Sequence, residues 1–137
     1  MDIAKDLALI DLLCTLDFPA EHGGTDVGRG GPGYHIARLG PDDWPGAEDC
    51  YAYETGIGER LTERWGEPSR WGTVTLGERL ARGEHLAEPW ATLNAQASDL
   101  CTWQANGTGR SITVAVADRE DENRPQPFVV VTDLNPR

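Results

Sequence analysis

Three side chains in the first third of the chain could together hold a metal ion. His22, Asp26 and His35 lie in one glycine-rich stretch, and imidazole with carboxylate suits zinc or a similar ion. The histidines lack the i, i+4 spacing of helical metal sites and belong to no HExxH-like frame. In so polar a stretch we expect histidines to be exposed. These three residues define an alternative ligand site, and the sequence predicts no resident cofactor.

The same stretch could also be a phosphate-binding loop. Gly28, Gly30 and Gly33 fit the pattern GxGxxG. A dinucleotide site needs this pattern between a strand and a helix, with the pyrophosphate at the helix N-terminus. Here a helix is expected before the glycines, and no Gly-Lys-Ser/Thr follows them. We therefore favour a flexible connection or a lid over a nucleotide site.

Nucleophiles and acidic clusters give no catalytic signature either. Ser69, Ser98 and Ser111 lie outside any GxSxG frame, and no CxxC pair is present. The acidic stretch 118–122 lacks the spacing of a calcium loop. The sequence favours a protein without catalysis and leaves an enzyme open.

The strongest bulk property is the net charge of −11. An acidic surface repels phosphate backbones and anionic lipid headgroups, so nucleic acids and membranes are not the expected partners. A basic protein is the favoured encounter. The oligomeric state stays open, with a homodimer among the alternatives.

We expect such a partner to dock on a helix at 47–65 and on the segment before it. The apolar stripe of this helix is needed for the core, which leaves its acidic residues for contact. The same acidity could simply keep the protein in solution. The residues predicted to bind a partner are Asp42, Asp43, Glu48, Asp49, Glu59 and Glu63, with Trp44 as an aromatic anchor.

Three widely spaced cysteines, Cys14, Cys50 and Cys101, each lie beside an apolar residue. Such residues are usually buried free thiols and fit a reducing compartment. The N-terminus lacks the layout of a signal peptide, and the apolar run 7–16 is too short to span a bilayer. We therefore expect a cytoplasmic protein, and its arginine-rich composition favours a bacterial, GC-rich genome.

The elements that must position these residues begin with two helices. A helix is predicted at 2–17, with Asp2 and Asp6 complementing the dipole of its first turn. A second is predicted at 47–65, with Asp43 as a cap and Gly66 as its stop. Between them, about 18–46 reads as one long flexible connection, because it contains eight glycines and four prolines, although 34–39 could form a short strand.

Strands dominate the second half. A short strand is predicted at 70–75, a capping box at 75–78 opens a further helix, and 99–105, 110–118 and 127–133 form an antiparallel meander. The run 128–131 is apolar on both faces, which is typical of a central strand or one covered twice. Trp65 and Trp103 are expected in the core. The prediction is a single α+β domain over 1–137, a two-layer fold in which two main helices pack on a sheet of three to four strands.

Two segments resemble small uncharacterised bacterial proteins, some of them similar to immunity proteins that neutralise secreted toxins. The resemblance rests on the helix end Leu61–Pro68 and on the run from Trp103 to Val131. It implies an interaction protein, of which an immunity-like inhibitor is one form. The alternative is a small-molecule- or metal-binding protein, or a minor enzyme, with a site under the 18–46 segment.

Overall fold

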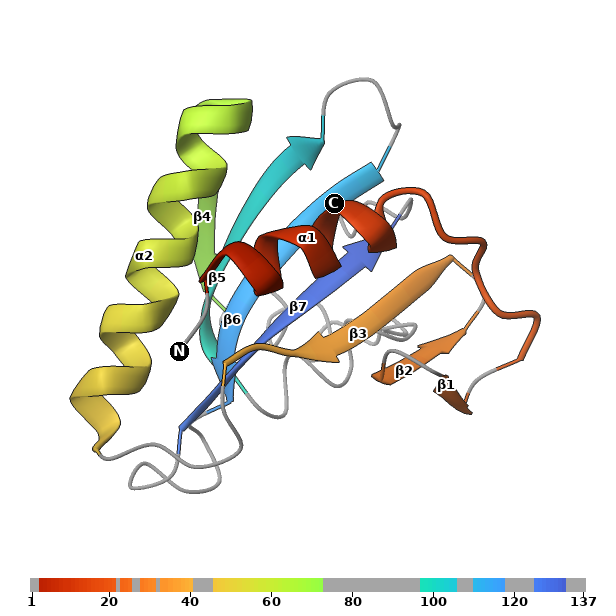
Figure 1. Ribbon diagram of the computed structural model, residues 1–137, viewed down its shortest axis with the longest axis horizontal. Coiled ribbons are helices and arrows are strands. Elements are labelled where there is room, and N and C mark those ends of the chain that lie inside the picture. The colour runs from red at the N-terminus through yellow and green to blue at the C-terminus, as the bar shows by residue number, and fades with distance from the viewer. Residues whose placement is uncertain are drawn as a thin grey trace, which may run out of the picture.

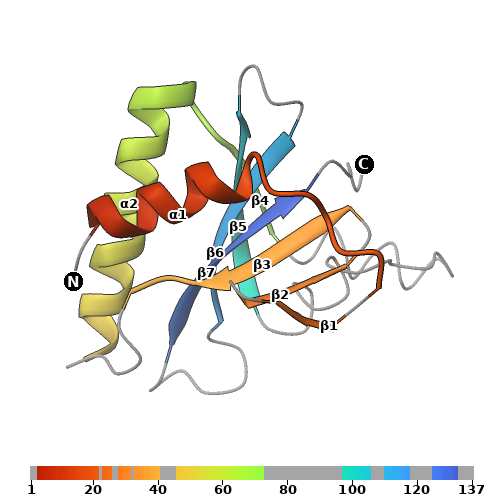
Figure 2. The same cartoon turned by 45° about the vertical axis from the view of Figure 1, so that its right-hand side comes forward.

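In the residues that it describes, the computed structural model has two helices on one face of an antiparallel sheet, which confirms the α+β class (Figure 1). The helices are α1 (Ile3–Leu13) and α2 (Ala47–Trp65). Figure 2 shows both helices on the same side of the strands. No described helix is long and apolar enough to cross a membrane. The structure describes residues 3–21, 23–25, 28–31, 33–40, 46–72, 97–105, 110–117 and 125–132.

The sheet has seven strands in the order β1-β2-β3-β7-β6-β5-β4, and every neighbouring pair is antiparallel. The three strands β5, β6 and β7 lie side by side in chain order, so the predicted meander is confirmed. The strands are β1 (Gly23–Thr25), β2 (Gly28–Gly31), β3 (Tyr34–Arg38), β4 (Ser69–Gly72), β5 (Ala97–Ala105), β6 (Arg110–Ala117) and β7 (Gln126–Thr132).

The predicted meander of three to four strands forms as β4–β7, but the sheet is larger, because the 18–46 segment is not one connection. It contains β1, β2 and β3, and β3 joins the meander by pairing with β7. Two of its glycines lie where the backbone approaches other atoms closely. A Cβ at Gly28, which has φ +149°, would lie 2.3 Å from the carbonyl oxygen of Ile36, and one at Gly30 would lie 2.9 Å from Cγ of Pro19. The expected flexibility of the segment stays a prediction.

Strand β7 is the middle strand of the sheet, between β3 and β6. Val129 and Val131 belong to the core under the helices, and Phe128 and Val130 on the opposite face are buried as well. The prediction from the apolar run 128–131 is therefore confirmed. Strand β7 is therefore buried on both faces of the sheet.

The sequence predicted the bounds of α2 more accurately than those of α1. α2 begins and ends as predicted, and the amide of Gly66 donates to the carbonyl oxygen of Thr62 at 2.9 Å. Its N-cap is Gly46, in extended conformation and without a side-chain cap, whereas the expected cap Asp43 lies outside the described residues. The helix predicted at 2–17 is shorter, ending at Leu13. The elements predicted at 75–83 and 85–96 also lie outside the described residues.

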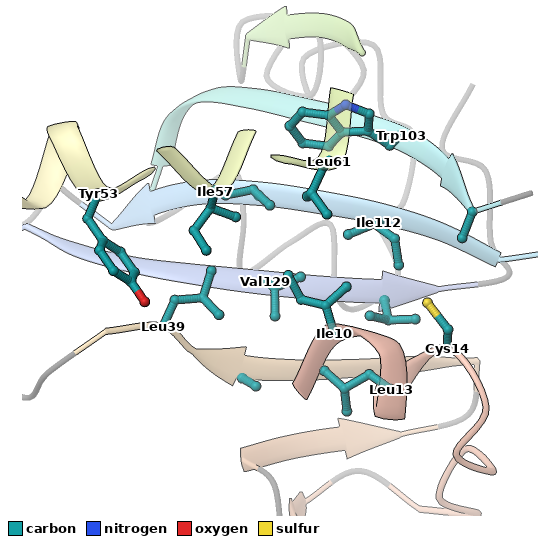
Figure 3. Close-up of a cluster of buried hydrophobic side chains, with 14 residues drawn as sticks. Ile10, Leu13, Cys14, Leu39, Tyr53, Ile57, Leu61, Trp103, Ile112 and Val129 are labelled. Atoms are coloured by element: carbon teal, nitrogen blue, oxygen red, sulfur yellow. The ribbon is translucent and has the colours of Figure 1, made fainter. Parts of the chain in front are cut away.

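The core lies between the helices and the sheet (Figure 3). Ile57 and Leu61 point from α2 toward the strands, and Ile10 points from α1. Trp103 on β5 is buried as predicted and donates from Nε1 to the hydroxyl of Thr62 at 3.3 Å. Trp65, at the end of α2, is only partly buried and packs at the margin of this core.

Candidate functional site

The predicted partner-binding acids on α2 are exposed because the opposite side of the helix is committed to the core. Its buried residues recur every three or four positions, at Cys50, Tyr53, Ile57 and Leu61. A stripe of this spacing turns the remaining positions toward solvent. The acids left exposed are Glu48, Asp49, Glu59 and Glu63. The predicted Asp42, Asp43 and Trp44 lie outside the described residues.

The exposed charge is not uniform along α2. Glu63 lies 4.0 Å from Arg60, and Arg64 contacts Asp11 of α1 at 2.5 Å, so the C-terminal half contains both signs of charge. The first three turns, Ala47–Ile57, contain no arginine or lysine. The acidity is therefore concentrated in the N-terminal half, around Glu48 and Asp49. We call the exposed surface of Ala47–Ile57 the acidic surface.

An aromatic side chain, Tyr51, lies within the acidic surface. It is 38% exposed, one turn after Glu48. Tyr51 was not among the predicted partner-binding residues, although its position next to Cys50 of the buried stripe indicates that it faces outward. Tyrosine is enriched at protein–protein interfaces, where its ring supplies apolar contact area and its hydroxyl can hydrogen-bond.

Helix α2 is fixed to the rest of the fold at several points. The buried carboxylate of Asp6 accepts hydrogen bonds from the hydroxyl of Tyr53 and from the amide of Gly40, the latter at 2.8 Å. From the sequence, Asp6 was expected only to complement the dipole of the first turn of α1. Its burial could have been inferred from its position between Ile3 and Ile10 on the apolar stripe of α1. These contacts hold the acidic surface in a defined orientation.

His35, one of the residues of the alternative ligand site, was expected to be exposed, and this expectation was wrong. Its exposed fraction is 1%, because β3 is an interior strand and the segment after α1 packs on it. Nε2 lies 3.1 Å from the carbonyl oxygen of Asp17, to which it donates, and the ring contacts that of Phe18. The imidazole therefore has a structural role. His22 and Asp26 lie outside the described residues.

No group of three or more histidine, cysteine or acidic side chains that could hold a metal ion occurs in the described part of the chain. The cysteines likewise show no nucleophile. Cys14 and Cys50 are buried free thiols and Cys101 is partly buried. Burial, and then the negative charge of Asp11, raise the pKa of the Cys14 thiol despite the opposing effects of Arg110 and Arg64. A raised pKa disfavours the reactive thiolate.

The geometry therefore brings together a helix packed on the sheet, exposed carboxylates and one exposed tyrosine, and it buries His35. No protein-family model, curated protein or solved structure matches this chain.

Proposed function

We propose that this chain is an interaction protein without catalysis, which binds a basic protein through the acidic surface of α2. The observation that carries the proposal is the exposure of Glu48 and Asp49 on three helical turns that contain no basic residue. The chain as a whole has a net charge of −11, so its field adds to that of the surface. The specific form we propose is an immunity-like inhibitor, acting in the cytoplasm of a bacterium.

Charge and shape would contribute differently to such a complex. Exposed carboxylates raise the rate of encounter with a cationic surface, and their effect weakens as salt screens them over about 8 Å at physiological ionic strength. Tyr51 would supply apolar contact area once the two surfaces meet. Because Tyr53 and Asp6 hold α2 in place, the surface would dock without the entropic cost of ordering a segment.

The same acidity could serve solubility alone, and the two functions differ in what they require of position. A solubility device depends on total charge, so a charge reversal at any exposed site has the same effect. A docking surface depends on where the charge lies. Charge reversals at Glu48 and at Glu67, both exposed, therefore separate the two.

The proposal is tested with the protein encoded next to this chain in its genome, provided that it is basic. Isothermal titration of the two purified proteins should give a defined stoichiometry, and co-expression of this chain should protect cells from any toxicity of the neighbour. Binding without protection would support the interaction and overturn the inhibitor form. If a basic neighbour neither binds nor is neutralised, the proposed function is wrong.

A further inference from the structure

We draw no further inference here: the strongest candidate, the buried imidazole of His35 between β2 and the segment after α1, has an Nδ1 atom without a hydrogen-bond partner, but its described neighbours Phe18, Pro19 and Gly30 offer no group that would identify a ligand.

Discussion

The hydroxyl of Tyr53 donates a hydrogen bond to the carboxylate of Asp6 and so joins α2 to α1 at a point shielded from water. The two side chains belong to residues that are 5% and 8% exposed. The same carboxylate accepts the amide of Gly40, where the chain leaves β3. One buried acid therefore connects both helices and the sheet, and it is the contact whose loss should disturb the orientation of α2 most.

Replacing Tyr53 with phenylalanine tests this connection. Tyr53→Phe removes a donor from a buried carboxylate, and hydrogen bonds to charged groups contribute about 1.5–3 kcal/mol, so the free energy of unfolding should fall by that amount. Urea denaturation measures the change. The matched control is Tyr51→Phe, which alters an exposed tyrosine on the same helix. Equal losses from both variants would show that the contact with Asp6 contributes nothing particular.

Arg110 on β6 closes the C-terminal end of α1. Its guanidinium donates to the carbonyl oxygens of Leu13 and Leu16 at 2.5 and 2.6 Å and lies 4.2 Å from the ring centre of Phe18. Cations at this end of a helix are also favoured by the dipole. These contacts hold the end of α1 and the segment after it on the sheet.

Arg110→Met keeps the aliphatic stem but removes the charge and the donors. We expect the free energy of unfolding to fall by about 1.5–3 kcal/mol. Arg60→Met, at an exposed arginine 4.0 Å from Glu63, should cost less than about 1 kcal/mol. Chemical denaturation of both variants provides the comparison. A loss at Arg60 as large as that at Arg110 would contradict the role given to Arg110.

Replacing a glycine inside α2 should stabilise the protein, whereas the substitutions at Tyr53 and Arg110 should destabilise it. A Cβ at Gly58 would lie 3.6 Å from the ring of Trp103, an ordinary contact, so Gly58→Ala should stabilise the protein by about 0.5–1 kcal/mol through helix propensity. At Gly56 the Cβ would lie 3.1 Å from Cδ1 of Ile3, and the gain should be smaller because Ile3 must move. The denaturant concentration at the midpoint of unfolding measures the stability of both variants, provided that the slope of the unfolding free energy against denaturant concentration is unchanged. Destabilisation by Gly58→Ala would show tighter packing against Trp103.

The thiols should differ in reactivity. Cys101 is partly buried, whereas Cys14 and Cys50 are buried, so Cys101 should react first with a chromogenic disulfide reagent under native conditions. Rapid native labelling of Cys14 would contradict its burial and its raised pKa.

The raised pKa of Cys14 also predicts a dependence of stability on pH. The unfolded chain releases this proton at a lower pH than the folded protein does. The contribution of Cys14 is therefore fully present below the ordinary thiol pKa and is lost as the pH rises through the raised value. Cys14→Ala should flatten the alkaline limb of a plot of unfolding free energy against pH. An unchanged limb would show that other groups cause any alkaline loss.

Local patterns were sufficient for much of the fold. The alternation in 99–105 and 110–118 predicted β5 and β6, and the stripe from Cys50 to Leu61 predicted α2 with its bounds. The possible strand at 34–39 is β3, but β1 and β2 were missed because their glycines hide the alternation on which strand prediction depends. Of these strands only β3 pairs with β7, which lies far along the chain, and β2 and β1 add to β3 in turn.

The candidate site could also be predicted only in part from the sequence. The exposure of Glu48 and Asp49 follows from the buried stripe on their own helix, so it could be inferred. The burial of Asp6 follows from the apolar stripe of α1, whereas the burial of His35 depends on the packing of residues 14–21 on β3, which no local pattern reports. Local sequence patterns therefore do not predict the burial of a polar residue that is covered by segments distant in the sequence.

The central claim is that the position of negative charge on α2, and not its total amount, drives association with a basic partner. The most direct measurement is the association rate with the basic neighbour protein, by stopped flow, at about 10 mM and about 150 mM salt. The double reversal Glu48→Lys/Asp49→Lys is compared with Asp17→Lys/Glu67→Lys, which makes the same change in charge at two exposed acids outside the acidic surface. We predict that at low salt the first variant associates at least tenfold more slowly than the wild type and the second loses less, because the screening length is then about 30 Å; at about 150 mM salt, where charges are screened over about 8 Å, the second stays close to the wild-type rate. Equal rates for the two variants would contradict the claim and leave the acidity as a solubility device.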